Sequence, residues 1–156
     1  MSNQPFIVKV EWLTKLSEWI QKADNNFKSI PKLLKIIGRR VVDEAVMDYF
    51  LKKESPKGEK WKDLSPNYAK KKLSKKGVLD ILIGEGTLRK SIKYWVIGER
   101  AVAVGVNSPD VPYARAHQKG YKDKNIPARP YLGIGKKEEE IIDRTVLDWI
   151  GGILNK

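Results

Sequence analysis

The chain contains a single histidine, and its surroundings are the first place to look for chemistry. His117 stands in the segment YARAHQKG, shortly before the stretch IPARP, which holds Arg129 between two prolines. Histidine is the usual general base near neutral pH, and a preorganised arginine can bind a carboxylate with two hydrogen bonds. The acidic residues near the histidine are only Asp110 and Asp123, so a metal site lacks ligands. We therefore expect His117 to hydrogen-bond the backbone near the proline-rich stretch.

Two other stretches resemble sites only superficially. GEGTLRKS, residues 84–91, lacks the G-x-x-x-x-G-K-[ST] spacing of a phosphate-binding loop, so a glycine turn before a strand is the simpler interpretation. The acidic cluster from Glu138 to Asp143 falls in the first turns of a predicted helix, where carboxylates complement the helix dipole. Because the chain has no cysteine, disulfides, thiolate catalysis and cysteine-ligated zinc are excluded. The sequence therefore predicts no enzyme, no cofactor and no metal site.

The charge of the chain favours anionic partners. Its formal net charge is +12, from 31 lysines and arginines against 19 aspartates and glutamates. Half of this excess comes from one segment, the lysine patch, where eight lysines stand against two acidic residues. Lysine supplies charge with little fixed geometry, so a solvated surface is the first interpretation and weak, non-specific DNA contact is the alternative. The lysine patch consists of Lys57, Lys60, Lys62, Lys70, Lys71, Lys72, Lys75 and Lys76.

The length of 156 residues and the hydrophobic pattern predict one domain over residues 1–156. Its expected class is α+β, with long helices packed on a small antiparallel sheet of about three to four strands. No apolar run approaches the ~20 residues of a membrane span, and the N-terminus lacks the pattern of a signal peptide. We therefore expect no membrane contact.

The positions of apolar residues, prolines and glycines give the order of the predicted elements. The first half has a strand at 6–10, an amphipathic helix at 11–23, a long core-facing helix opened by Pro31 and capped by Ser29, and a short lysine-rich helix that begins at Ser65 and Pro66 and ends at Gly77. The second half has a hairpin of strands 91–97 and 101–106 and a short helix or turn ending at Gly120. A third, edge strand at 125–134 and a C-terminal amphipathic helix at 136–156 follow.

Two side chains are expected to hold this arrangement together. Trp61 is isolated among lysines, and we expect its ring to be partly buried and to pin the Pro56–Gly58 turn onto the end of the long helix. Pro127 and Pro130 stiffen the backbone around Arg129, so this arginine should make an ion pair or bind backbone carbonyls. Its partners then lie either within the chain or in a neighbouring copy.

Several short motifs follow one another in an order that is more specific than any one of them. They are PKGEKW, ILIGEGTLRKSI, AVGV, YARAHQKG and IPARPYLG. The positions concerned are Phe50, Pro56, Gly58, Trp61, Leu64, Ser65, Ile81, Leu82, Gly86, Leu88, Ser91, Ile92, Val104, Gly105, Tyr113, Ala114, His117, Gln118, Gly120, Ile126, Pro127, Ala128, Arg129, Pro130, Tyr131, Leu132 and Gly133.

This order resembles the phage virion morphogenesis family, the tail completion proteins typified by the Mu-like and P2-like tailed phages. The resemblance covers about residues 30–135 and is most specific in the last two motifs. Glu85 replaces the threonine that usually precedes the glycine at the position of Gly86, and the lysine patch is heavier than the family pattern.

The resemblance implies a structural role without catalysis. Such proteins finish the phage tail or its connection to the head by docking as repeated copies on a ring-shaped neck or tail end. The implied partners are other tail or neck proteins and further copies in a homo-oligomeric ring. The implied location is the tail or neck of the virion, and the host cytoplasm during assembly. The residues then expected to serve structure or an interface are Trp61, Tyr113, His117, Gln118, Gly120, Pro127, Arg129, Pro130 and Tyr131.

Two alternatives stay open at this point. One is a non-specific nucleic-acid-binding module that uses the lysine patch, and the other is a hydrolase or nuclease that uses His117. A convergent acidic pocket beside His117 would favour the enzyme. A long basic groove with exposed aromatic residues would favour nucleic acid.

Overall fold

A computed structural model of the protein describes residues 6–9, 30–77, 79–106, 109 and 111–154. Its α+β class confirms the prediction, whereas the expected helix at 11–23 and the Ser29 cap lie outside the described residues. No helix in these ranges is both long enough and apolar enough to cross a membrane. The elements are β1 (Phe6–Lys9), α2 (Ile30–Arg40), the π-helical segment η1 (Val41–Val46), α3 (Met47–Lys52), α4 (Pro66–Lys76), α5 (Thr87–Ser91), β2 (Ile92–Ile97), β3 (Ala101–Val106), α6 (Ala114–Lys119), the 3₁₀ turn η2 (Lys122–Lys124) and α7 (Lys136–Leu154).

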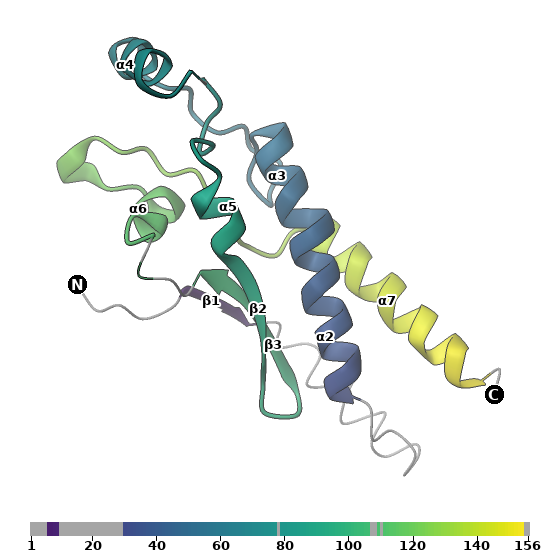
Figure 1. Ribbon diagram of the computed structural model, residues 1–156. Coiled ribbons are helices and arrows are strands. Elements are labelled where there is room, and N and C mark those ends of the chain that lie inside the picture. Colours follow the sequence, from purple (N-terminus) through teal and green to yellow (C-terminus); the bar gives the residue numbers. More distant parts are fainter. Residues whose placement is uncertain (1–5, 10–29, 78, 107–108, 110, 155–156) are drawn as a thin grey trace.

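A continuous helical rod formed by α2, η1 and α3 carries the core (Figure 1). Its apolar side chains recur at every third or fourth position, which places them on one face. The buried ones include Leu34, Ile37, Ala45 and Phe50. The rod ends at Lys53, which takes a left-handed conformation with a φ of 57°. In Figure 1 this rod lies between the β2–β3 hairpin and α7.

The sheet has three antiparallel strands in the order β1-β3-β2, so β3 is central. In the register of the hairpin, Tyr94 pairs with Val104. The rod approaches this face closely at Gly38, where a Cβ atom would lie only 2.7 Å from the side chains of Tyr94 and Val102. Glycine therefore sets the distance between α2 and the sheet at this point. The turn of the hairpin uses Gly98 with a φ of 59°, as its position in the sequence predicted.

The edge strand predicted at 125–134 is wrong. This segment contains only an isolated bridge in which Ile126 pairs with Tyr121, and residues 127–135 form no strand. The third strand of the sheet is β1 instead. The physical reason is that Pro127 and Pro130 have no backbone N–H to give to a ladder. The backbone of residues 130–132 is bonded by side chains instead, as described below.

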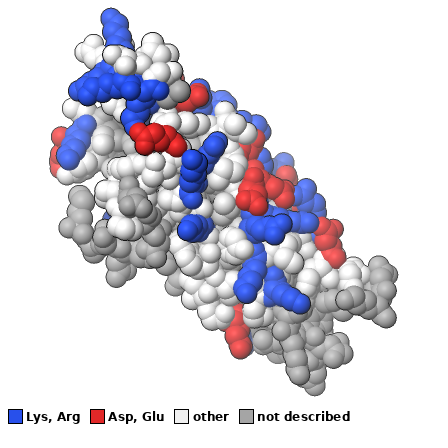
Figure 2. Space-filling model, in the orientation of Figure 1, with Lys and Arg blue, Asp and Glu red and all other residues white. Residues whose placement is uncertain are grey.

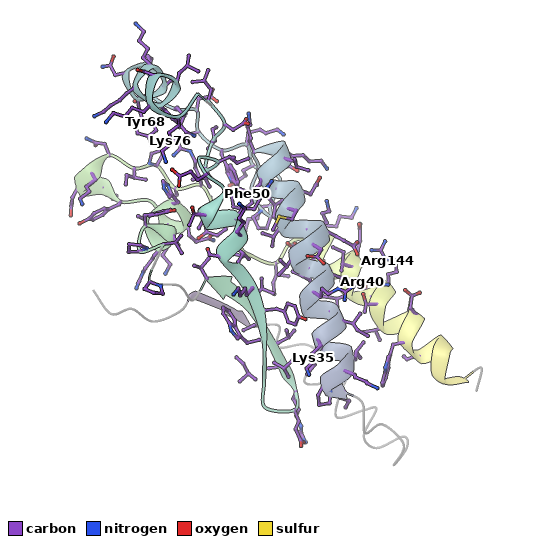
Figure 3. The ribbon with its side chains drawn as sticks, viewed as in Figure 1. Lys35, Arg40, Phe50, Tyr68, Lys76 and Arg144 are labelled. Carbon is purple, nitrogen blue, oxygen red and sulfur yellow. The ribbon has the colours of Figure 1, made fainter. Side chains whose placement is uncertain are left out.

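Helix α7 packs along the rod and is tied to it at its flanks (Figure 3). Ile142 is fully buried on its inner face. On the flanks, Arg40 donates to Asp148 at 3.2 Å, and Arg144 donates to Glu44 at 2.5 Å. Both contacts join residues that are about a hundred positions apart in the sequence. The inner face of α7 is therefore fixed by packing and its flanks by ion pairs.

Glu138, in the first turn of α7, is buried rather than exposed to solvent. Its Oε2 atom accepts hydrogen bonds from the hydroxyl of Tyr49 at 2.7 Å and from the backbone N–H of Gly135 at 2.9 Å. Its Oε1 atom is buried without a partner in the described structure. Burial raises the pKa of this carboxyl, and the hydrogen bonds from Tyr49 and from the backbone oppose the rise only in part. Glu138 thus lies in the first turn of α7, where a carboxylate complements the helix dipole, but its side chain is part of the core.

The raised pKa of Glu138 predicts a pH-dependent stability. Because the folded state favours the neutral carboxyl, its contribution to stability is present below the ordinary pKa of 4.5 and is lost as the pH rises through the folded pKa. We expect Glu138→Gln, which is neutral at every pH, to change the Tm more favourably at about pH 7.5 than at about pH 4. Thermal unfolding at the two pH values measures this. Glu139→Gln, at an exposed neighbour in the same turn, should lack the gain at about pH 7.5, because its carboxylate is solvated. An equal response of the two variants would contradict the assignment.

Candidate interaction site

A side-chain amide holds the extended segment that follows α6. The Oε1 atom of Gln118 accepts hydrogen bonds from the backbone N–H groups of Tyr131 and Leu132, both at 3.0 Å. Its Nε2 atom donates to the carbonyl of Leu132 at 2.6 Å. The backbone N–H of Arg129 donates to the carbonyl of His117 at 2.7 Å. Gln118 and the end of α6 therefore supply the bonds that a neighbouring strand would otherwise give.

Trp61 packs against the same segment and bonds to its backbone at Pro130. Its ring is only 5% exposed, and its Nε1 atom donates to the carbonyl of Pro130 at 2.7 Å. The ring meets Phe50 edge to face, with centroids 5.5 Å apart, and Phe50 also contacts Tyr131. The backbone N–H of Trp61 donates to the carbonyl of Lys53, at the end of the rod. The predicted burial of Trp61 against the end of the long helix is confirmed.

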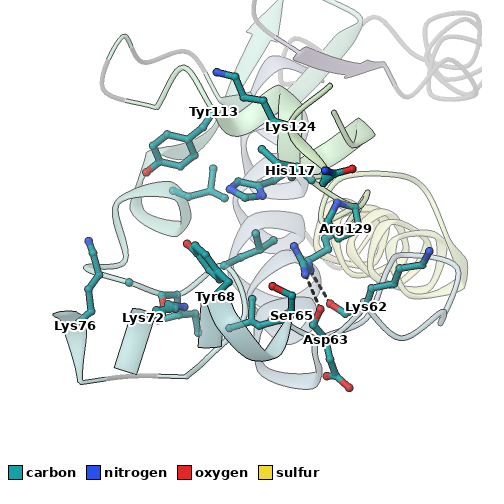
Figure 4. A pocket seen from close by; sticks show the side chains of 18 of the residues that line it. Lys62, Asp63, Ser65, Tyr68, Lys72, Lys76, Tyr113, His117, Lys124 and Arg129 are labelled. Carbon is teal, nitrogen blue, oxygen red and sulfur yellow. Dashed lines mark hydrogen bonds between the residues drawn. The ribbon is translucent and has the colours of Figure 1, made fainter. Parts of the chain in front are cut away.

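Arg129 is buried and binds backbone carbonyls, which is one of the two outcomes expected for it. Its Nε atom donates to the carbonyl of Lys62 at 2.8 Å, and its Nη2 atom donates to the carbonyl of Asp63 at 3.0 Å (Figure 4). Both carbonyls belong to the loop that leads into α4. Burial lowers the pKa of Arg129, but an arginine remains charged. Within the described chain Arg129 therefore acts as a clamp on the loop before α4.

Gly120 allows the backbone after α6 to approach the segment held by Gln118 closely. Its φ is 79°, and an added Cβ would lie 3.0 Å from the backbone nitrogen of Ala128. A similar approach occurs where an added Cβ at Gly135 would lie 2.0 Å from the carbonyl oxygen of Pro56. The Pro56–Gly58 turn thus packs directly on backbone at the start of α7. We call Trp61, Gln118, Arg129 and Tyr131, with the backbone they hold, the lock.

Beside the lock lies a cleft of about 1150 Å³. Its walls come from α4, α6, the η2 loop and the loop before α5. Figure 4 shows Tyr68, His117 and Arg129 around its middle, with Lys72 and Lys76 along the α4 side. The floor includes apolar side chains, and the lining residues used below are Leu64, Tyr68, Leu88, Tyr113, Lys122, Lys124 and Ile126.

The cleft is basic. Six lysines and arginines line it against two acidic residues, Asp63 and Glu85. Lys76 pairs with Glu85 at 2.9 Å, and Lys72 donates to the carbonyls of Asp80 and Ile83, with the latter bond at 2.8 Å. These bonds tie α4 to the loop before α5. Among the described residues, the lysines at 62, 122 and 124 have no recorded ion pair and are exposed, so they carry the outward positive charge.

His117 lines the cleft but has none of the partners that a catalytic base requires. Burial lowers the pKa of its imidazole, and the charges of Arg129 and Lys72 lower it further, so the ring is neutral near pH 7. Its Nδ1 atom is buried without a hydrogen bond in the described structure, so the expected bond from this side chain to the backbone is not found there. Its backbone carbonyl serves the lock instead. In the described ranges, no three acidic or histidine side chains gather closely enough to hold a metal ion.

The lysine patch does not form one surface. Lys72 and Lys76 line the cleft, as does Lys62, whereas Lys60 pairs with Glu54 at 3.0 Å beside the end of the rod. The remaining lysines of the patch are exposed, and in Figure 2 basic side chains crowd around α4. Helix α4 itself has no buried residue. It therefore stands off the body as one wall of the cleft, as Figure 1 also shows.

The sequence analysis missed the lysines of the η2 loop and the place of Tyr68 in the cleft. Tyr68, Lys72 and Lys76 recur every four residues, which puts them on one helix face. This spacing is present in the sequence, but it does not show that the face it defines borders a cleft. Lys122 and Lys124 reach the cleft only because the chain turns between Tyr121 and Ile126, which no periodic pattern predicts.

These features define a class: an α+β protein with a buried, hydrogen-bonded lock and a basic cleft beside it. The model of the phage virion morphogenesis family matches residues 12–151, and the chain belongs to this family. An uncharacterized protein of Methanocaldococcus jannaschii, MJ0331, is 38% identical over 92 residues, which are 58% of this chain and 64% of that protein. The chain thus spans less than two thirds of this relative. No solved structure matches the chain.

Replacing the amide of Gln118 by an apolar side chain should destabilise the fold strongly. Gln118→Leu removes the bonds to two backbone N–H groups and one carbonyl, and each buried group left without a partner costs about 1–3 kcal/mol. The free energy of unfolding should therefore fall by at least about 3 kcal/mol. Urea unfolding followed by tryptophan fluorescence measures it. Arg115→Ala, at an exposed position of the same helix, should change it by less than about 0.5 kcal/mol. A Gln118→Leu protein as stable as the parent would show that the lock does not hold.

Proposed function

We propose that this protein completes the tail, or the connection between tail and head, of a tailed phage or prophage, and docks there as repeated copies. The observation that carries the proposal is membership of the phage virion morphogenesis family over nearly the whole chain. The family is a structural and assembly family, so its members are associated with the virion. On this proposal the protein sits in the tail or neck of the particle and is in the host cytoplasm during assembly.

The geometry supports a structural rather than a catalytic role. The polar side chains of the two most specific motifs are used in bonds within the fold. Gln118 and Arg129 bind backbone groups, and Tyr131 donates to the carbonyl of Ala114. A catalytic site keeps its reactive groups available to substrate. His117 lines the cleft, and in the described structure no carboxylate orients its ring. We therefore propose that the protein is not an enzyme.

A second candidate, non-specific nucleic-acid binding, is favoured by the cleft itself. It is basic, and two tyrosines on it, Tyr68 and Tyr113, are 55% and 41% exposed. Exposed aromatic rings beside lysines are typical of proteins that bind single strands. Against this, the clamp role of Arg129 occupies the cleft's arginine, and Glu85 and Asp63 on its walls repel phosphate. Structural docking therefore remains the first proposal.

Removal of the gene from its phage or prophage genome tests the proposal. Without the protein, heads and tails should form but remain separate, because the piece that joins or finishes them is missing. Electron microscopy of lysates measures the ratio of joined particles to free tails. A plasmid copy of the parent gene should restore joining, and Gln118→Leu should not. Infectious particles at the normal yield without the gene would contradict the function.

A further inference from the structure

The outer face of α7 carries an acidic stripe that the fold does not use. Lys136, Glu140, Asp143 and Leu147 follow one another at spacings of three and four residues, so they lie on one line of the helix. This line points away from the buried face that Ile142 belongs to. Leu147 is 68% exposed, and the side chain of Glu140 is 67% exposed. We call Glu140, Asp143 and Leu147 the α7 stripe.

The charges on the flanks of α7 differ from those of the stripe in having partners on the rod. Arg144 and Asp148 pair with Glu44 and Arg40. In the stripe, Glu140 has only a long 3.9 Å contact with exposed Lys136, and no ion pair of Asp143 is recorded among the described residues. An exposed pair of this kind contributes little to stability. The carboxylates of the stripe are therefore available to a partner.

The cleft has the complementary chemistry. Lys122 and Lys124 lie on its rim with exposed charges, and its interior offers Leu64, Ile126 and the ring of Tyr68. Two carboxylates beside one exposed leucine match two lysines beside an apolar floor. Duplex DNA, which offers phosphates but no apolar side chain, would leave that floor uncovered.

The two surfaces cannot meet within one molecule. In Figure 1, α7 runs along the side of the rod away from α4 and α6, which form the walls of the cleft. In Figure 2, acidic side chains are interspersed along the α7 side, whereas basic ones dominate around α4. We propose that the α7 stripe of one copy binds in the basic cleft of the next copy, with Leu147 on the apolar floor and Glu140 and Asp143 against Lys122 and Lys124.

Such a contact joins two different patches and is head to tail. Repeated head-to-tail contacts form a ring when the rotation closes, and a filament when it does not. The inference rests on the proposed docking of repeated copies and names the surfaces that would make it. The contact also gives α4 a role. This helix has no buried residue and is attached through polar bonds, so it can shift to fit α7 of the next copy.

Disulfide trapping tests the contact, because the chain has no cysteine of its own. A protein with both Tyr68→Cys and Leu147→Cys should form a ladder of multimers under mild oxidation, since each copy links to the next. Each single-cysteine protein should give no ladder, and a mixture of the two should stop at dimers. The matched control is Tyr68→Cys with Leu51→Cys, because Leu51 is 70% exposed and Leu147 is 68% exposed. The control should give no ladder.

Reversing the charges on the two surfaces is the second part of the test. Glu140→Lys with Asp143→Lys should abolish the ladder of the two-cysteine protein, and so should Lys122→Glu with Lys124→Glu. All four changes in one chain should restore it, because the charges are complementary again. No ladder from the two-cysteine protein, a ladder of equal yield from the Leu51 control, or dimers of Leu147→Cys alone would overturn the proposal.

The outcomes separate this inference from the proposed function. Separate heads and tails without the gene, together with no ladder, would leave the function and remove the contact. A ladder, together with normal particles in the absence of the gene, would leave the contact and remove the function. Retarded migration of single-stranded DNA by the parent, lost in Lys122→Glu with Lys124→Glu and unaffected by Glu140→Lys with Asp143→Lys, would assign the cleft to nucleic acid and overturn the contact.

Discussion

The backbone of residues 129–132 must be hydrogen-bonded in the core without a neighbouring strand. Pro130 and the preceding Pro127 exclude it from the sheet, yet Tyr131 and Leu132 are almost fully buried. An unpaired buried N–H or carbonyl destabilises the fold as much as a lost hydrogen bond. The amide of Gln118 solves this problem by pairing with both residues at once. The position of α6, the burial of Trp61 and the anchoring of the loop before α4 by Arg129 all depend on that segment being fixed.

Fixing this segment also builds the cleft. Arg129 holds the carbonyls of Lys62 and Asp63, which sets where α4 begins, and the turn at Gly120 brings the η2 loop to the opposite wall. The side chains of the lock are buried, whereas α4 has no buried residue and is attached by polar bonds. A buried, hydrogen-bonded frame loses little order when a partner binds beside it, which would favour the docking proposed above. The family membership and the architecture thus support the same kind of role.

The sequence predicted the parts of the fold that local patterns control. The periodic apolar residues of α2 and α7, the glycine of the hairpin turn and the proline at the start of α4 each follow from backbone or packing preferences. The failure at 125–134 has a different origin. An extended, proline-rich stretch was interpreted as an edge strand, but whether its bonds come from a strand or from Gln118 depends on a contact that tertiary structure decides.

The site was predictable to a similar extent. Trp61 and Arg129 were assigned structural contacts from the improbability of an exposed ring and from the stiffness of the prolines, and their hydrogen bonds agree. The cleft was not predicted, because its walls come from four segments that no sequence pattern connects. The burial of Glu138 was missed for the same reason: its partner Tyr49 lies 89 positions away. Net charge pointed to an anionic partner but gave no surface for it.

The central claim is that the amide of Gln118 replaces a strand for residues 131 and 132. Native-state hydrogen exchange measured by NMR tests it directly, because it reports each backbone N–H separately. The account predicts that the amides of Tyr131 and Leu132 exchange within about tenfold of the rate of Val104 in the central strand. Exchange as fast as that of Gly98, in the exposed hairpin turn, would show that the segment opens freely and would contradict the account.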